Sequence, residues 1–347
     1  MYIRAKAPLR ISLAGGGTDV SPYSDIYGGA ILNFTINRYA YTTIEPTNTN
    51  KIIIQLVDFK TSKINKIIFD SALELPTDHA GILVAGVYNR VVKDFVKKPL
   101  SFTITLGVDA PPGSGLGTSS AVVVSILGAF AEWFKLPFGK YDLANLAYSI
   151  EREDLKMAGG KQDQYAATFG GANYMEFYEN NKVIVNPLGL DDEVLFELSN
   201  NLVLYNTETS RLSSKIIESQ QRNVKSGNKN SIEAMHKLKE QVKEMKAALF
   251  SGDLLKIGHM LHSGWQYKKQ MADEITNPSI DAVYQTAIEA GAVGGKISGA
   301  GGGGFFFFYC PGVIKYDVIN ALNKKSGKVL NFGFTQQGIE TWTYKNK

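Results

Sequence analysis

The apolar and polar positions of this chain repeat with two periods, which predict a mixture of strands and helices. Alternating or β-branched apolar residues predict strands in the first half at 3–12, 28–44, 51–57 and 101–108, and two short strands around Asn180 and Asn181. Apolar residues spaced three and four apart predict helices at 78–98, starting from an Asp78 cap, at 119–134 and at 140–157. The first half therefore predicts an α+β arrangement.

The second half follows an acidic, turn-rich stretch at 188–200, where we place a domain boundary. The pattern then predicts a strand at 202–206, helices near 210–222, 231–250, 253–271 and 278–291, an apolar strand at 305–309, a helix near 316–324 and two closing strands. Strands and helices are mixed in this half too. The sequence therefore predicts two α+β domains, at 1–190 and 191–347.

The composition is that of an ordinary globular chain and excludes several classes of protein. Of the 347 residues, 44% are hydrophobic and 20% are charged. The net charge of +4 comes without a block of like charges, so we expect an anionic small molecule rather than nucleic acid as the partner. The single cysteine, Cys310, excludes a disulfide framework and a cysteine-based zinc site, and it fits a reducing compartment. The charged start of the chain, and the lack of an apolar run near about 18 residues, predict a cytoplasmic protein without signal peptide or membrane span.

Three glycines at alternate positions mark a loop between a predicted strand and a predicted helix. Gly113, Gly115 and Gly117 can take positive φ, so that successive backbone N–H groups turn toward one anion. Three hydroxyl residues at 118–120 follow as candidate helix caps, and the start of the helix adds unpaired N–H donors and partial positive charge. The loop predicts a cradle for phosphate groups, and the alternative is an ordinary tight turn with a good cap.

A second glycine run, at 15–17, ends the first predicted strand and is followed by Asp19. Glycine lets the backbone approach a ligand closely, and a carboxylate at the mouth of such a loop suits the hydroxyl groups of a polyol. The alternative is that Asp19 caps the turn around Ser21 and Pro22.

A third glycine run, at 299–304, matches the G-x-G-x-x-G pattern of dinucleotide-binding folds. That pattern requires a helix after the glycines, whereas an aromatic strand at 305–309 follows here, so the dinucleotide interpretation fails. The P-loop sequence G-x-x-x-x-G-K-[ST] is also absent. The interpretation that remains is two flexible glycine loops, one from each domain, meeting over a triphosphate.

The other candidates for chemistry are weak. His259 and His262 are three residues apart on a predicted helix, but no third ligand completes a metal site, so packing or a surface position is favoured. No serine lies in a G-x-S-x-G elbow, and Cys310 follows the aromatic strand, where a buried structural thiol is favoured over a nucleophile. Hydrolase chemistry therefore has little support.

Three segments together resemble the motifs of the GHMP kinases, a family that includes galactokinase, homoserine kinase, mevalonate kinase and phosphomevalonate kinase. They are Ala-Pro-Leu-Arg-Ile-Ser-Leu-Ala-Gly-Gly-Gly-Thr-Asp at 7–19, Pro-Pro-Gly-Ser-Gly-Leu-Gly-Thr-Ser-Ser-Ala at 111–121 and Lys-Ile-Ser-Gly-Ala-Gly-Gly-Gly-Gly at 296–304, in the order and spacing of the family. The resemblance implies a two-domain fold, with ATP bound between an N-terminal α+β domain and a C-terminal ferredoxin-like α+β domain.

The resemblance also implies roles for individual residues. Asp163 stands at the position of the catalytic aspartate, with Arg10 as its basic partner, and helix capping is the alternative for Asp163. Mg²⁺ would be held by Ser119 and by Glu151, twelve residues before Asp163, with Glu153 as the rival if the register slips. ATP would contact the two glycine loops at Pro112, Gly113, Ser114, Gly115, Leu116, Gly117, Thr118, Ser119, Ser120, Gly299, Gly301 and Gly302. Phosphoryl transfer depends mainly on positioning of the reactants, neutralisation of the phosphate charge and a carboxylate that accepts the hydroxyl proton. This set of residues agrees with those requirements.

For the acceptor, the Gly-Gly-Gly-Thr-Asp form of the first motif, together with Gly-Lys-Gln-Asp-Gln-Tyr at 160–165, is most similar to bacterial family members that act on a heptose phosphate. The implied reaction is phosphorylation of the anomeric hydroxyl of D-glycero-D-manno-heptose 7-phosphate, in the synthesis of GDP-heptose for surface polysaccharide. The sugar would contact Gly17, Thr18 and Asp19. Its phosphate would need a cation from the set Lys6, Lys161, Arg211 and Lys215, with Arg211 as first choice.

Two alternatives stay open: a fucokinase-like or other hexose 1-kinase, and an inactive family member that senses sugar and ATP. The sequence does not fix the oligomeric state, and a homodimer is one option.

Overall fold

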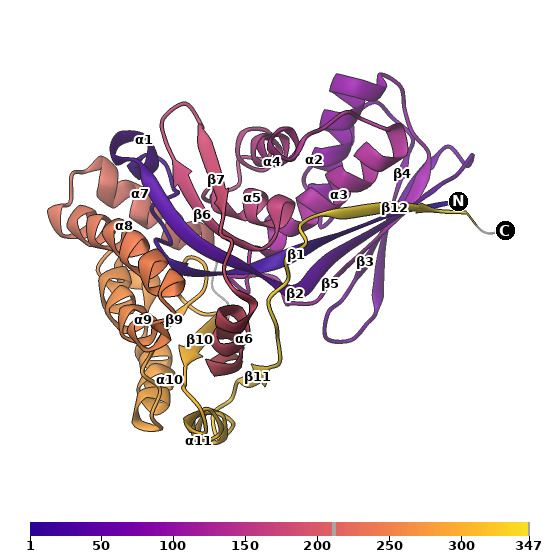
Figure 1. Cartoon of the computed structure of the whole chain (residues 1–347). Helices are drawn as coiled ribbons and strands as arrows, with labels where there is room; N and C mark the ends of the chain where they lie inside the picture. Colours follow the sequence, from indigo (N-terminus) through magenta and orange to yellow (C-terminus); the bar gives the residue numbers. More distant parts are fainter. Residues whose placement is uncertain (210–212, 346–347) are drawn as a thin grey trace.

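Eight strands form a large sheet that runs through the first half of the molecule (Figure 1). The computed structural model of the protein describes residues 1–209 and 213–345. The sheet has the order β12-β1-β2-β5-β3-β4, with β6 and β7 continuing from β2, and its first seven strands are β1 (Tyr2–Ala14), β2 (Gly29–Pro46), β3 (Lys51–Val57), β4 (Ile64–Asp70), β5 (Phe102–Val108), β6 (Ala172–Phe177) and β7 (Val183–Pro187). The predicted strands of this half are confirmed. The edge strand β4 is not among them, because it is largely exposed and has no clear alternation.

Four helices cover one face of this sheet, α2 (Ile82–Val91), α3 (Thr118–Phe134), α4 (Lys140–Ser149) and α5 (Gln162–Phe169) (Figure 1). The central helix, α3, packs on β1 and β2, and all its residues from Ser120 to Phe130 are buried. This burial explains its unbroken run of small and apolar residues. A short helix, α1 (Tyr23–Tyr27), and two π-helical turns, η1 (Val92–Val96) and η2 (Ile150–Asp154), complete this half.

Two predicted helix boundaries are wrong. The helix expected to start from Asp78 begins at Ile82, and Gly81 is its cap residue. The helix expected to reach Met157 ends in η2 at Asp154, because Lys156 has a left-handed φ of 52° that interrupts the helix.

A four-stranded antiparallel sheet forms the centre of the second half. Its order is β11-β8-β10-β9, with β8 (Leu202–Asn206), β9 (Gly294–Ile297), β10 (Phe305–Tyr309) and β11 (Lys328–Leu330). Counted in chain order, its strands lie fourth, first, third, second, which is the expected ferredoxin-like arrangement. The helices of this half are α6 (Asp192–Asn201), α7 (Ser213–Lys225), α8 (Lys229–Phe250), α9 (Leu254–Lys269), η3 (Asp273–Ile275), α10 (Pro278–Glu289) and α11 (Ile314–Leu322). Among the described residues, no helix has both the length and the apolar composition needed to cross a membrane.

The stretch at 188–200 differs from its prediction as a turn-rich segment, because most of it forms α6. Leu195 and Leu198 lie on one face of this helix and are buried, whereas the acidic residues Asp192 and Glu193 lie in its first turn, where negative charge is favourable. The acidic composition therefore reflects a helix start rather than a linker.

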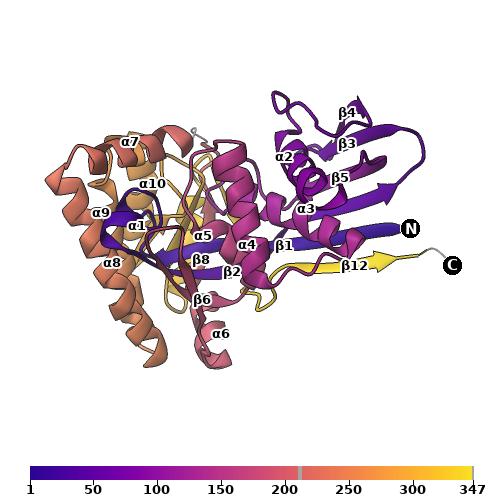
Figure 2. The ribbon, with the colours of Figure 1, turned by 90° about the horizontal axis from the view of Figure 1, so that it is seen from above.

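The two halves share part of their interior. One buried apolar cluster includes Leu9 of β1, Leu127 of α3, Val242 of α8 and Phe307 of β10. A late segment of the chain also returns to the first half, since β12 (Glu340–Tyr344) pairs antiparallel with β1, where Tyr2 lies opposite Tyr344 (Figure 2). The domain division at residue 190 stays a prediction, and β12 is the part of 191–347 that joins the first sheet.

Candidate functional site

A cavity of about 480 Å³ lies where the three glycine segments come together. Its walls come from the loop after β1, the loop before α3, the turn that links η2 to α5, helices α7 and α9, and the start of the third glycine segment. The predicted site residues that line it are Arg10, Gly17, Asp19, Gly113, Ser114, Gly115, Gly117, Thr118, Ser119, Ser120, Glu151, Asp163 and Gly299. Most of the predicted site is therefore brought to one place.

The loop before α3 has the backbone expected of an anion cradle. Gly113, Gly115 and Gly117 all have φ between 72° and 75°. Gly117 is the cap residue of α3, so the prediction that the hydroxyl residues at 118–120 cap this helix is wrong. Instead, Thr118 Oγ1 and Ser114 Oγ lie 2.7 Å apart across the loop. The hydroxyl groups are thus free of a capping role at the helix end that faces the cavity.

The glycine loops of the two halves touch each other through their backbones. Phe305 N donates to Ser114 O over 3.1 Å, and a Cβ added to Gly115 would lie only 2.3 Å from Ser298 O. No side chain fits there, because real Cβ atoms essentially never approach other atoms this closely. The two loops are held in contact, as the interpretation of two loops over one ligand requires.

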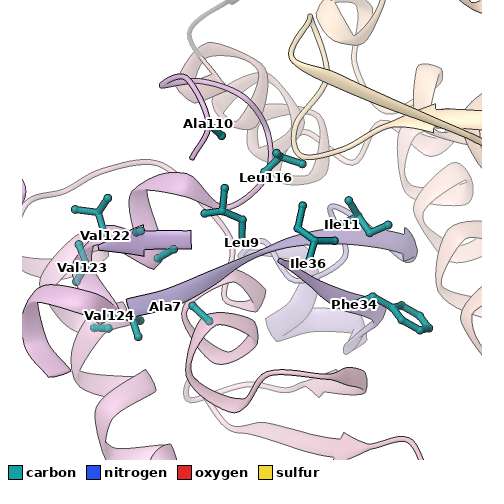
Figure 3. Close-up of a cluster of buried hydrophobic side chains, with 14 of the residues drawn as sticks. Ala7, Leu9, Ile11, Phe34, Ile36, Ala110, Leu116, Val122, Val123 and Val124 are labelled. Atoms are coloured by element: carbon teal, nitrogen blue, oxygen red, sulfur yellow. The ribbon is translucent and has the colours of Figure 1, made fainter. Parts of the chain in front are cut away.

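Several residues predicted to bind ATP do not line the cavity, and their prediction stays untested. Leu116 is buried in the same cluster as Leu9 and Ile11 of β1, where it anchors the loop to the core (Figure 3). Gly302 N donates to Ile275 O over 2.8 Å, and a Cβ on Gly301 would also meet Ile275. The residues predicted for ATP that do not line the cavity are Pro112, Leu116, Gly301 and Gly302.

Asp163 is held by Arg10 at the point where both loops meet. Asp163 Oδ1 accepts a hydrogen bond from Arg10 Nε at 2.7 Å, and Arg10 Nη2 lies 2.7 Å from the same oxygen in an ion pair. Arg10 Nη1 donates to Gly115 O at 2.5 Å and to Ser298 Oγ at 3.1 Å, so one guanidinium ties the carboxylate to both glycine loops. Asp163 is in the first turn of α5 and makes no side-chain cap there. Within the described residues, no donor reaches its Oδ2, and the side chain is 22% exposed.

Glu151 is a fully buried carboxylate at the base of the loop. Its Oε1 accepts from Ser119 Oγ at 2.8 Å, and its Oε2 accepts from Ser120 Oγ at 2.6 Å and from the Gln164 amide. Arg152 Nη1 lies 3.7 Å from Oε1 and balances part of its charge. The rival position, Glu153, does not line the cavity.

Asp19 is also buried at the cavity, but it does not cap the turn around Ser21 and Pro22. Its Oδ2 accepts from the backbone N–H groups of Lys161 and Gln162 at 2.9 and 3.1 Å, at the start of α5. Burial and the nearby Asp163 carboxylate raise the pKa of Asp19. Its neighbour Thr18 is turned away, since the Thr18 hydroxyl bonds to the carbonyl oxygens of Gly15 and Ala30.

Three of the four cations predicted for a sugar phosphate, Lys6, Lys161 and Lys215, do not line the cavity. Lys161 Nζ pairs with Asp25 at 2.9 Å, and Lys6 Nζ pairs with Glu340 at 2.7 Å on the surface. Lys215 is exposed and does not line the cavity. Arg211, the first choice, lies outside the described residues.

Instead, the structure places two lysines that sequence reasoning missed beside the first glycine run. Lys268 of α9 lines the cavity, and Lys296 of β9 lies close by; each is 2% exposed. Burial lowers the pKa of Lys268 to about 8 and lowers that of Lys296 strongly, and the Arg10 charge adds to both effects. One signal was available: Lys268 lies three residues after buried Trp265, on the apolar face of its helix, where a lysine is out of place. Other missed lining residues are Arg152, Lys156, Gln162, Ser213, Ser214 and Gln220.

His259 and His262 lie on the surface of α9, and the cysteine lies in a packing position. His262 Nδ1 and the Tyr284 hydroxyl are 2.8 Å apart, and the described residues contain no cluster of three metal-binding side chains. Cys310 is buried, as predicted, and burial raises its pKa to about 12, which makes it a poor nucleophile.

Comparisons with known proteins agree with this geometry. The GHMP kinases N terminal domain model matches residues 83–171, and the GHMP kinases C terminal model matches residues 245–328. The chain is 45% identical over 340 residues to the D-glycero-alpha-D-manno-heptose 7-phosphate kinase of Campylobacter jejuni, with 98% of each protein covered. It also resembles the crystal structure of a D-glycero-D-manno-heptose 1-phosphate kinase from Bacteroides thetaiotaomicron, at 45% identity and a TM-score of 0.83, with 99% of this chain and 100% of that chain covered. A Lactococcus lactis galactokinase complexed with galactose, 18% identical with a TM-score of 0.76 over 98% of this chain and 95% of that one, shares the fold.

The chain therefore belongs to the GHMP kinase family. It is a phosphotransferase that uses ATP and has an alcohol group as acceptor.

Proposed function

We propose that this enzyme transfers the γ-phosphoryl group of ATP to the anomeric hydroxyl of D-glycero-D-manno-heptose 7-phosphate and so makes the 1,7-bisphosphate. The observation that carries the proposal is the Asp163 carboxylate, with one oxygen held by Arg10 and the other open in a cavity lined by glycine loops from both halves. The heptose as acceptor rests on the two relatives at 45% identity whose names specify it.

The chain supplies the parts that phosphoryl transfer needs. Backbone N–H groups of the loop at 113–117 and the start of α3 neutralise the phosphates of ATP, and Arg10 adds a cation near the reacting phosphorus. The anomeric oxygen forms a bond to the γ-phosphorus while the bond from that phosphorus to the β,γ-bridging oxygen breaks. Asp163 accepts the hydroxyl proton, and ADP leaves with the electron pair of the broken bond.

The donor set at the base of the loop fits Mg²⁺. Ser119 Oγ and Glu151 Oε1 lie 2.8 Å apart at the cavity, and both are hard oxygen donors of the kind that Mg²⁺ prefers alongside phosphate oxygens. When bound, the ion would neutralise charge on the phosphates and help to orient them. Ser120 and Gln164 fix the Glu151 carboxylate in place through its other oxygen.

Asp19 and the backbone of Gly17 suit the hydroxyl groups of the sugar. Asp19 Oδ2 accepts a hydrogen bond from the backbone at the start of α5. Its Oδ1 has only longer contacts, 3.3 Å from Gly17 N and 3.4 Å from Gln162 Nε2. This oxygen can therefore accept a hydrogen bond from the acceptor without loss of the helix contact.

A panel of acceptors tests the proposal. The panel includes both heptose phosphates, because the names of the two relatives place the phosphate of the acceptor at position 7 in one and at position 1 in the other. We expect ATP-dependent ADP formation with the 7-phosphate and a second ³¹P resonance from an anomeric phosphate in the product. The 1-phosphate, unphosphorylated heptose, fucose and galactose should be poor acceptors. Efficient turnover of an unphosphorylated hexose would favour the hexose 1-kinase alternative, and no turnover of any acceptor would favour the sensor.

A further inference from the structure

Two buried lysines, Lys268 and Lys296, flank the first glycine run, and neither forms an ion pair with a carboxylate among the described residues. A Cβ placed on Gly16 would lie 3.6 Å from Lys268 Nζ and 3.8 Å from Lys296 Nζ, so both charges reach the same glycine. Arg10 adds a third cation to this group, because its charge acts on both lysines. The carboxylates that line this part of the cavity are Asp19, Asp163 and Glu218 of α7, and Asp163 is already paired with Arg10.

The two lysines have little compensation inside the protein. Lys268 Nζ donates to the Gly299 carbonyl, which is a neutral partner. For Lys296 Nζ, no acceptor lies within hydrogen-bonding distance among the residues that the structure describes. Burial without a counter-charge disfavours the protonated form of both lysines, and an anionic ligand beside them would stabilise that form.

An amide beside the lysines gives an independent indication of a ligand. Gln220 of α7 lines the cavity and is 2% exposed, and its Oε1 would lie 3.6 Å from a Cβ on Gly17. Its Nε2 has no hydrogen-bond partner in the described part of the chain. Buried N–H donors are normally paired with a hydrogen-bond acceptor. The unpaired Gln220 Nε2 therefore indicates that a ligand supplies an acceptor at this end of the cavity.

We propose that Lys268, Lys296 and Gln220 form a subsite for a phosphate group that the acceptor already carries. This inference rests on the proposed function and identifies the cations for its second phosphate. Lysine ammonium groups bind phosphate as compact charges, and an amide N–H adds direction.

The position of the subsite separates it from the phosphates of ATP. Glu151 accepts a hydrogen bond from Ser119 at the start of α3, and Asp163 and Arg10 lie against Gly117, the cap residue of α3. The lysines instead lie beside Gly16 in the first glycine run, and Lys268 also donates to the carbonyl of Gly299. An alcohol oxygen at Asp163 would thus stand between the ATP phosphates on one side and the acceptor's own phosphate on the other.

The test compares phosphorylated and unphosphorylated acceptors in the variants Lys268→Met and Lys296→Met. Each should raise the KM for heptose 7-phosphate roughly 30-fold, as loss of a charge-assisted hydrogen bond implies, while KM for ATP and the low rate with unphosphorylated heptose change less than about threefold. Lys256→Met, an exposed position on the same helix, is the control and should match wild type. Equal losses with both acceptors, or a raised KM for ATP, would overturn the proposal.

Two further measurements keep the result interpretable. Lys296→Met should raise the melting temperature of the ligand-free enzyme, because it replaces a buried amino group that has no counter-charge with an apolar side chain of similar length. A lower melting temperature with a uniform loss of activity would show a structural role instead. If wild type phosphorylates no heptose, titration with inorganic phosphate decides the subsite separately. Binding to wild type that is lost in Lys296→Met would keep the subsite while the proposed substrate fails, and equal or absent binding would reject the subsite.

Discussion

The two ends of the cavity are built from different chemistry. The end that contacts the start of α3 uses glycine backbone, hydroxyl groups and the carboxylate of Glu151. The glycines and hydroxyl residues are consecutive in the chain, and Glu151 lies at the family's spacing of twelve residues before Asp163. The other end uses side chains from α7, α9 and β9, far apart in sequence. A site made of backbone can be read from the glycines that it needs, whereas a site made of single side chains on three elements cannot. Asp163 lies where the two ends meet, and the variants below test each side of it.

The largest effect is expected at the junction itself. Asp163→Asn keeps the size of the side chain and one acceptor for Arg10, but it cannot take the hydroxyl proton. Loss of a general base of this kind lowers kcat by about 10³-fold, or about 4 kcal/mol of transition-state stabilisation. The measurement is kcat from ADP release, with nucleotide binding checked by calorimetry. Retained binding with kcat above a tenth of wild type would show that Asp163 only positions the acceptor.

At the end of the cavity that contacts α3, Glu151→Gln should lower kcat/KM for ATP roughly 10²-fold, or about 3 kcal/mol. The amide removes a Mg²⁺ ligand, and its N–H group faces the Ser119 and Ser120 hydroxyls, which donate to Glu151. The rate should also need a higher Mg²⁺ concentration for saturation. Glu153→Gln is the matched control, since it is nearby but outside the cavity lining. If both variants had the same Mg²⁺ dependence as wild type, Glu151 would have no part in binding the ion.

The same contrast explains how much of the structure could be predicted. Strands such as β3 and β8 agree with their predicted bounds, because alternation and β-branched residues specify them locally. The glycine loops are predicted from their own residues, whereas the Arg10 and Asp163 pair is implied by the family resemblance. By contrast, Thr18 and Lys161 are the right residue types in the right motifs but point into the protein, and nothing in local sequence fixes that orientation.

The missed residues were missed for a related reason. The position of Lys268 on the apolar face of its helix is the one sequence signal, and the burial of both Lys268 and Lys296 depends on how α9 and β9 pack beside the loop at 15–17. Helix α6 is a second case in which local sequence is not enough. Its sequence predicts a turn-rich segment, but burial of Leu195 and Leu198 against the rest of the fold stabilises a helix. Tertiary contacts decide both cases.

The contact between the two glycine loops gives the third prediction. Gly115→Ala places a Cβ 2.3 Å from Ser298 O at a φ of 75°, so the loops must separate. Gly252→Ala has a similar φ of 70° with open space around its Cβ, and it isolates the cost of backbone strain alone. We expect Gly115→Ala to lower the free energy of unfolding by about 2 kcal/mol more than the control, as overpacking does. Equal values from chemical denaturation would mean that the loops move apart freely.

The smallest effect expected is the pH dependence of the lysine end. Burial and the Arg10 charge lower the pKa of Lys268 from its ordinary value of 10.5 to about 8, whereas the Asp19 charge acts to raise it. Lys296 faces Gly16 together with Lys268. If the protonated lysine binds the acceptor's phosphate, KM for heptose 7-phosphate should rise above pH 8, reaching roughly tenfold, or about 1.4 kcal/mol, near pH 9. The ligand-free enzyme should behave in the opposite way: between pH 8 and 10.5 the unfolded chain binds the Lys268 proton more strongly than the folded one, so stability rises with pH relative to Lys268→Met. Both trends should be absent from Lys268→Met, and a wild-type KM that stays flat from pH 7 to 9.5 would show that the charge of Lys268 does not act on the acceptor.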